Sequence, residues 1–346
     1  MAEQTNPVDL EEAVPSGPLG AWIAANVEGA QGAVRVDQLA GGSSNLTFRV
    51  RDDANDWVLR RPPLRHVLAT AHDMAREHTV QAALQGTDVP VAPQVALCDD
   101  KSVIGAPFYL MQRLDGVVYD DVDAVAGITE EQALGATYEL ADVLAHLHTT
   151  DYEAVGLGEF GRPAGFMARQ LSRWQKQWAA SELEPVAEID AVVPRLEAML
   201  PPEGRYGIVH GDYSFNNTMF RAGDPTKMLA LLDWEMSTLG DPLSDVGTLL
   251  MYWGEVGERL WSARKQQAHR ANAGFPDADT LLARYQATSG IDVSHIDFYI
   301  SFATYKLAVI SQGAAKRISL TDPERAAGTV ASVRWLAETA LRYAGG

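Results

Sequence analysis

The sequence predicts a two-lobed α+β protein whose N-terminal lobe is mainly β and whose C-terminal lobe is mainly helical. The chain has 346 residues, which is long for one domain and suits two lobes. Short apolar runs separated by glycine and proline turns fill its first third. Longer segments with helical periodicity dominate the remainder. We therefore expect a mainly β first lobe at residues 1–115 and a helical second lobe at residues 116–346.

Composition places the chain among ordinary globular proteins with a sizeable core. Hydrophobic residues make up 47% of it and charged residues 21%. The single cysteine, Cys98, excludes an internal disulfide framework and a cysteine-rich zinc site. Residues 1–18 lack the basic start and apolar core of a secretory signal, and no apolar segment reaches the roughly 20 residues of a membrane-spanning helix. We expect a cytoplasmic protein, monomeric or homodimeric, without a membrane partner.

The net charge of −18 arises from 46 acidic and 28 basic residues. Such a field repels nucleic acid and anionic membranes, so we expect neither as a partner. It would suit a cationic small molecule. A generic acidic, solvated surface explains the same charge, and charge alone does not choose the substrate.

The first lobe is predicted as strands joined by short turns, with a lead-in helix at 19–27 and a second helix at 71–84. The strands are expected at 34–39, 46–50, 57–60, 95–98 and 107–111. The turn before the second strand reads Gly41-Gly42-Ser43-Ser44-Asn45. Its backbone N–H groups and hydroxyls could cover phosphates, although Gly-Gly also makes ordinary hairpins.

The second lobe is predicted as helices around one apolar segment. Thr129 to Gln132 has the pattern of a capping box before a helix that ends near His148. A helix at 167–178 carries Trp174 and Trp178 one turn apart, where they could stack on an apolar or cationic ligand or pack in the core between helices. Further helices are expected at 259–273, 277–288, 296–316 and 323–344. The segment 298–310 is apolar nearly all round and predicts a central buried helix, interrupted by Lys306.

One stretch, 207–246, concentrates the polar residues that carry chemistry. Two apolar runs, 208–209 and 228–232, each end in an acidic residue, which we expect to meet as a β-hairpin or an open strand pair. His210-Gly211-Asp212 follows the first run, Asn217 comes five positions after Asp212, and Asp233 ends the second run. That pairing would bring Asp212, Asn217 and Asp233 to one edge.

Phosphoryl transfer from a nucleotide requires such a trio. One carboxylate orients or deprotonates the acceptor hydroxyl, while another carboxylate and an amide oxygen hold Mg²⁺. The alternative is a set of plain turns, in which Asp and Asn are common.

The string H-G-D-x-x-x-x-N followed by D-W-E resembles the aminoglycoside phosphotransferase and choline kinase-like family. The nearest resemblance is to the subfamily related to the kinase-like domains of some acyl-CoA dehydrogenases, over roughly residues 20–340. It implies a protein-kinase-like two-lobed fold. It also implies a phosphotransferase that moves the γ-phosphate of ATP or GTP to a hydroxyl of a small-molecule acceptor with Mg²⁺.

The resemblance also implies roles for individual residues. Asp212 is the catalytic carboxylate, and Asn217 and Asp233 are the metal ligands. Arg60 takes the place of the phosphate-binding lysine, with Glu77 as its ion-pair partner. Arg61 is the less favoured candidate, because its side chain should point to the opposite face of the strand.

Further roles concern the nucleotide and the surroundings of the loop. Ser43, Ser44 and Asn45 would cover the phosphates, and the backbone from Gln112 through Arg113 to Leu114 would bind the adenine. Three acidic residues later in the sequence also have expected roles. Asp245 is expected to hold the catalytic loop, Asp241 to order its own loop, and Glu235 to be a further candidate for metal or acceptor contact.

Two other functions stay open. A kinase-like nucleotide-binding protein without turnover would keep the fold. A metal-dependent hydrolase would use His210, Asp212 and Asp233 as ligands, which requires His210 to face the site.

Overall fold

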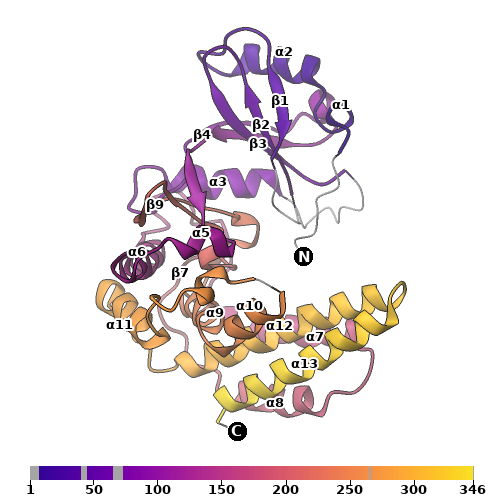
Figure 1. Ribbon diagram of the computed structural model, residues 1–346, viewed down its shortest axis with the longest axis vertical. Coiled ribbons are helices and arrows are strands. Elements are labelled where there is room, and N and C mark those ends of the chain that lie inside the picture. The colour runs from indigo at the N-terminus through magenta and orange to yellow at the C-terminus, as the bar shows by residue number, and fades with distance from the viewer. Residues whose placement is uncertain (1–7, 40–44, 65–72, 265, 346) are drawn as a thin grey trace. The chain divides into compact units, whose positions relative to one another are not determined.

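The computed structural model describes residues 8–39, 45–64, 73–264 and 266–345. They form two compact units. The first contains Met1–Val117, Met219–Gly223 and Met228–Ser237, and the second contains Val118–Thr218, Asp224–Lys227 and Thr238–Gly346. Figure 1 shows that a β-sheet dominates the first unit and helices dominate the second, as predicted. The resemblance also implies that residues 1–115 bind the nucleotide and that residues 116–346 carry the catalytic loop and the acceptor site, and this assignment stays a prediction.

The first unit is built on a five-stranded antiparallel sheet with the order β1-β2-β3-β5-β4. Its strands are β1 (Arg35–Gln38), β2 (Leu46–Arg51), β3 (Asp56–Arg61), β4 (Gln94–Cys98) and β5 (Phe108–Gln112). One face packs on α1 (Leu10–Ala13), α2 (Ser16–Asn26) and α4 (Lys101–Ile104) through buried residues that include Leu19, Phe48, Leu59 and Phe108. Helix α3 (Met74–Leu84) contacts β4 and β5.

Alternation along β3 separates two neighbouring arginines. Arg61 lies on the face that packs on α1 and α4, where it is buried and donates to the carbonyls of Ala13 and Ile104. Arg60 is directed to the other face, towards Glu77 of α3. This is the arrangement expected for successive residues of a strand.

The predicted pairing of 208–209 with 228–232 is wrong. Strand β7 (Gly207–Val209) pairs antiparallel with β10 (Thr238–Gly240). Strand β9 (Asp224–Leu231) is hydrogen-bonded instead to β8 (Thr218–Arg221), in a sheet of order β6-β8-β9 with β6 (Gly116–Val118). The segment after Asn217 is itself extended and leads into the tight turn at Gly223, so it occupies the edge of β9 that β7 was expected to take.

The second unit is a set of helices around α12. The helices are α5 (Val122–Ala126), α6 (Glu130–Thr149), α7 (Phe166–Ser181), α8 (Ala187–Ala198), α9 (Leu243–Trp253), α10 (Glu255–Arg264), α11 (Ala278–Ser289), α12 (Ile296–Ser319) and α13 (Pro323–Tyr343). Helix α12 packs against α13, α9, α7 and α8. Its buried residues include Phe298, Tyr299, Phe302 and Tyr305, so the predicted central buried helix is confirmed.

Two helix boundaries test the sequence rules. Thr129 caps α6 with its side chain, and Gln132 returns the hydrogen bond, so the predicted capping box is confirmed. The single helix predicted at 259–273 is wrong, because α10 ends at Arg264 and a 3₁₀ turn follows at Ala268–Ala271. Between them Gln267 has a φ of 61°, a left-handed conformation that a right-handed helix does not accept. Among the described residues, no helix combines the length and apolarity needed to cross a bilayer.

His269 is a buried polar residue that the fold does not satisfy. Its ring stacks on Trp253 with a centroid distance of 4.3 Å and touches Phe215 and Phe275 edge-on. Neither ring nitrogen has a hydrogen-bond partner among the described residues. Burial, assisted by the charge of Arg270, lowers the pKa of His269 to about 3, so the ring is neutral at physiological pH.

We predict that His269→Phe stabilises the protein. Replacing an unsatisfied buried ring by an apolar ring of similar shape removes a desolvation cost of about 1 kcal/mol, which should appear as a higher free energy of unfolding in urea. His269→Ala is the control, expected to lose about 3 kcal/mol through the cavity it creates. A Phe variant less stable than wild type would show that a ring nitrogen has a partner, such as an ordered water.

Candidate active site

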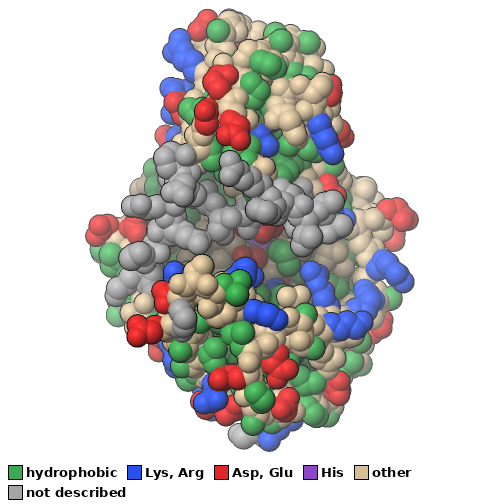
Figure 2. All heavy atoms as spheres, turned by 90° about the vertical axis from the view of Figure 1, so that its right-hand side faces the viewer, with side chains coloured by type: hydrophobic (Ala, Val, Ile, Leu, Met, Phe, Trp, Pro, Cys, Tyr) green, Lys and Arg blue, Asp and Glu red, His purple; other side chains and the backbone are tan. Residues whose placement is uncertain are grey.

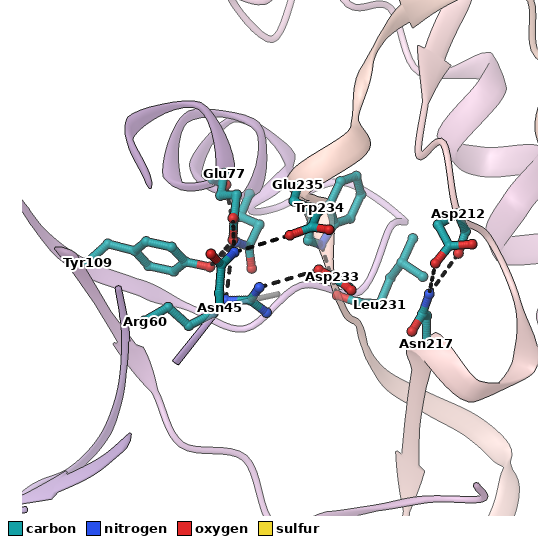
Figure 3. A network of polar contacts seen from close by, with 11 residues as sticks. Asn45, Arg60, Glu77, Tyr109, Asp212, Asn217, Leu231, Asp233, Trp234 and Glu235 are labelled. Carbon is teal, nitrogen blue, oxygen red and sulfur yellow. Dashed lines mark hydrogen bonds and ion pairs between the residues drawn. The ribbon is translucent and has the colours of Figure 1, made fainter. Parts of the chain in front are cut away.

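In the first unit, Arg60 joins two carboxylates. Its Nε lies 3.3 Å from Oε2 of Glu77, and its Nη2 lies 3.3 Å from Oδ1 of Asp233 (Figure 3). The predicted Arg60–Glu77 ion pair is therefore present. The side chain of Glu77 is 1% exposed and that of Asp233 is 34% exposed, so the cluster runs from the interior of this unit towards solvent.

Glu77 is fixed by further donors. The hydroxyl of Tyr109 donates to its Oε2 at 3.0 Å, and Nδ2 of Asn45 donates to its Oε1 at 2.8 Å. Burial raises the pKa of the Glu77 carboxyl, although the Arg60 charge and these hydrogen bonds oppose the shift. Burial alone would lower the pKa of Arg60, but its negative surroundings outweigh burial and raise that pKa above its ordinary range. Arg60 is thus a fixed, permanently charged guanidinium.

Asn45 bridges two parts of the cluster, because its Nδ2 also lies 3.3 Å from Oε2 of Glu235. It is buried and is the last residue of the turn predicted to cover phosphates. Ser43 and Ser44, the other predicted residues of that turn, lie outside the described residues.

Asp233 has an unusual backbone conformation for its position. It follows β9 with φ 64° and ψ 67°, in the left-handed region that Asp tolerates better than most residues. A 3₁₀ turn follows at Trp234–Met236, and Trp234 Nε1 donates to the Leu231 carbonyl at 2.9 Å. Such strain concentrates at functional sites, and here it directs the carboxylate of Asp233 towards Arg60.

In the second unit, buried Asp245 holds the loop that follows β7. Its carboxylate accepts the backbone N–H of His210 at 2.6 Å and that of Gly211 at 2.8 Å. Nε2 of His148 lies 3.3 Å from the same carboxylate, and Nδ1 of His148 lies 2.8 Å from the hydroxyl of Tyr285. The predicted structural role of Asp245 is consistent with these contacts.

Hydrogen bonds and nearby charges keep the buried carboxylate of Asp245 ionised. Burial by itself would raise the pKa of its carboxyl. The hydrogen bond and charge of His148, with the backbone donors, outweigh that effect and leave the pKa below its ordinary value.

Asp212 and Asn217 are brought together on this loop. Nδ2 of Asn217 donates to the carbonyl oxygen of Asp212 at 2.8 Å and to its Oδ2 at 3.0 Å. Because the amide nitrogen is turned to Asp212, Oδ1 of Asn217 points away from it, as Figure 3 shows. This oxygen is then available to a cation.

The three residues predicted to contact adenine differ in whether their backbone N–H already donates a hydrogen bond within the protein. The N–H of Gln112 donates to Pro93, and that of Arg113 donates to Asp56. Leu114, just beyond β5, has no hydrogen bond from its N–H within the described residues. A base at this strand end would therefore pair with Leu114 N–H or with the carbonyl groups.

The residues predicted as metal ligands suit Mg²⁺ in chemistry. The carboxylate of Asp233 and Oδ1 of Asn217 are the hard oxygen ligands that Mg²⁺ prefers, and it commonly takes few of them from the protein. No group of three or more His, Cys, Asp or Glu side chains within the described ranges is arranged to bind a metal. His210 is fully buried, and its Nδ1 lies 3.3 Å from the backbone nitrogen of Asp212, so its ring faces the interior.

The sequence did not indicate Lys306 as part of this region. Its Nζ donates to the carbonyl of Gly211 at 3.1 Å, directly before Asp212. The only available signal was a lysine within an otherwise apolar helix. Tyr299 of the same helix donates to Oδ2 of Asp241 at 2.5 Å, so Asp241 orders its loop as expected.

Comparisons with known proteins give consistent matches. The family model described as "Phosphotransferase enzyme family" matches residues 35–281. Mouse acyl-CoA dehydrogenase family member 10 is 32% identical over 321 residues, which cover 92% of this chain and 30% of that protein. Mouse family member 11 is 32% identical over 314 residues, covering 89% of this chain and 40% of that protein. The chain thus spans less than half the length of these relatives.

Two solved structures share the fold. A candidate aminoglycoside phosphotransferase from Ralstonia eutropha is 35% identical with a TM-score of 0.81, over 95% of this chain and 97% of that one. A thermostable mutant of aminoglycoside phosphotransferase APH(4)-Ia, in complex with ADP and hygromycin B, has a TM-score of 0.61 at 14% identity, over 94% and 98% of the chains. The fold class predicted from the sequence is confirmed.

Proposed function

The chain belongs to the phosphotransferase enzyme family, and we propose that it transfers the γ-phosphoryl group of ATP or GTP to a hydroxyl of a small-molecule acceptor, with Mg²⁺ as cofactor. The observation that carries the proposal is the fixed cluster of Arg60 between Glu77 and Asp233. It offers a guanidinium for nucleotide phosphates and, beside it, a carboxylate for their metal ion.

Each residue has a defined task in this reaction. Arg60 binds phosphate oxygens, for which its planar group is suited, and Glu77 fixes its orientation. Asp212 accepts a hydrogen bond from the acceptor hydroxyl and takes its proton as the new phosphorus–oxygen bond forms. The bond from the γ-phosphorus to the bridging oxygen breaks, and the nucleoside diphosphate leaves. Asp233 would supply a carboxylate oxygen to Mg²⁺, and Asn217 would supply its amide Oδ1. The metal ion, when bound, neutralises charge on the transferred phosphoryl group.

Asp245 and Asn217 prepare the second unit for this chemistry. Asp245 fixes the two peptides before Asp212, and Asn217 holds the carboxylate of Asp212. Positioning of this kind lowers the barrier because the reacting groups need not be ordered during the reaction. The solved complexes of related folds with ADP and with GDP support nucleotide as the donor.

The burial of His210 speaks against the hydrolase alternative, which needs that ring as a ligand. The remaining alternative function is a nucleotide-binding protein without turnover. It would bind nucleotide with Mg²⁺ and release no diphosphate with any hydroxyl acceptor.

We predict that nucleotide binding depends on Mg²⁺ and that Asp233→Ala removes this dependence. Calorimetric titration of ATP and GTP, each with and without Mg²⁺, should show at least about tenfold weaker binding in the variant, equivalent to about 1.4 kcal/mol. Asp37→Ala is the matched control. Asp37 lies on β1, outside the cluster, and pairs with Arg51 of β2. No binding by wild type at millimolar nucleotide would end the proposal.

A further inference from the structure

Lys306 is a half-buried cation beside the loop that carries Asp212. An ammonium group has three donor hydrogens. The Gly211 carbonyl is its one hydrogen-bond acceptor among the described residues, and no ion pair to a carboxylate is found for it there. Burial lowers the pKa of Lys306, although the charges of Asp212 and Asp245 oppose the shift. Two donor hydrogens are therefore left next to the proposed catalytic carboxylate.

A second cation shares the same aromatic ring. Nζ of Lys306 lies 5.7 Å from the ring centroid of Trp174, and Cζ of Arg173 lies 5.9 Å from it. Arg173 is exposed on α7 and has no carboxylate partner in the described part of the chain. Its charge lies close enough to Lys306 to lower the pKa of that lysine further.

Trp174 adds a third donor. It is 8% exposed, and its buried Nε1 has no acceptor among the residues that the structure describes. The predicted role of Trp174 as a platform for a cationic acceptor would require the ring to be available to an outside cation. Lys306 and Arg173, both from the chain itself, already lie against it.

The two like charges near one ring, the ammonium hydrogens that the Gly211 carbonyl does not use and Nε1 of Trp174, unpaired among the described residues, together suit an added anion. Like charges placed together are unfavourable unless an opposite charge joins them. Charge-assisted hydrogen bonds to an oxyanion would satisfy both cations. Figure 2 shows several Lys and Arg side chains close together on the helical unit, so the net charge of −18 does not describe every part of the surface.

We propose that Lys306 and Arg173, both near the ring of Trp174, bind an anionic oxygen group of the acceptor, a carboxylate or a phosphate. This inference rests on the proposed function, in which the acceptor hydroxyl is phosphorylated at Asp212. It departs from the cationic acceptor that the overall charge suggested.

Titration calorimetry of the whole chain with malonate, inorganic phosphate and neutral malonamide tests the inference. Malonate and phosphate should bind, and malonamide should not. Lys306→Met should weaken anion binding at least about tenfold, the loss of one charge-assisted contact, whereas Lys306→Arg should stay within a few-fold. The tighter of the two anions identifies carboxylate or phosphate as the group recognised.

Two control variants make the result specific. Lys316→Met removes a lysine of the same helix whose Nζ donates to the Ala180 carbonyl, and it should bind anions like wild type. Arg60→Met alters the proposed nucleotide-phosphate site and should retain the anion binding that Lys306→Met loses. Loss in Arg60→Met with retention in Lys306→Met would assign the anion to the nucleotide phosphates and overturn the inference, as would the absence of anion binding at high millimolar concentration.

Nucleotide titrations on the same samples separate the two proposals. If wild type binds nucleotide with Mg²⁺ but no anion, the inference about the acceptor fails alone. If it binds no nucleotide, the proposed function fails whatever the anions do.

Discussion

Asp212→Asn is expected to lower kcat for phosphoryl transfer by about a thousandfold, within the range of a lost general base. The variant keeps the shape of the side chain and retains an oxygen that can accept from Asn217, so the loop should be preserved. It loses the negative charge that accepts the hydroxyl proton. Because the expected nucleotide contacts of Arg60 and Asp233 are unchanged, nucleotide affinity should stay within a few-fold of wild type.

Single-turnover release of nucleoside diphosphate with a working acceptor measures the effect, and calorimetry measures nucleotide affinity. Asp151→Asn is the matched control, since Asp151 caps an exposed turn after α6. If Asp212→Asn binds nucleotide poorly or unfolds, the carboxylate is structural. A variant with near wild-type turnover would exclude it as the base.

Much of the first unit follows from local rules that the sequence displays. Alternation in β3 predicts that Arg60 and Arg61 face opposite sides, and the structure directs them to Glu77 and to the carbonyls of Ala13 and Ile104, respectively. Strand alternation is a local property, so one sequence is sufficient to predict it.

Pairing between distant segments could not be predicted in the same way. Strand β7 is three residues long and buried, and nothing in its composition selects β10 over β9 as its partner. That choice depends on which other segment, here β8, occupies the edge of β9. The left-handed conformation of Asp233 is likewise invisible in the sequence, because it is imposed by the surrounding structure.

Lys306 illustrates why part of the site escaped prediction. The nearly all-round apolar character of 298–310 predicts a central buried helix, and the lysine within it is an interruption of that apolar pattern. Its proximity to Gly211 depends on the packing of α12 against neighbouring elements, which links residues 95 positions apart. A charged residue within an otherwise apolar, buried helix is thus a useful indication of a functional site, even where the surrounding sequence gives no other sign of one.

Asp245→Ala is expected to produce the largest loss of stability, about 4 kcal/mol in the free energy of unfolding, as for other buried charged partners that are removed singly. The substitution leaves the N–H groups of His210 and Gly211 without their acceptor and deprives His148 of its carboxylate. Urea denaturation at neutral pH measures the loss. Asp292→Ala, which changes an exposed acid that accepts from Ser294, should stay near wild type.

The pH dependence of stability gives an independent test of the same residue. Its pKa is lowered in the folded protein, so Asp245 contributes stability that is fully present above the unfolded value of about 3.9 and is lost as pH falls through the folded value. Wild type should therefore lose more stability than Asp245→Ala between neutral pH and this acid range. Parallel curves would mean that Asp245 titrates alike in the folded and unfolded protein, and that its contacts with His210, Gly211 and His148 add nothing to its ionised form.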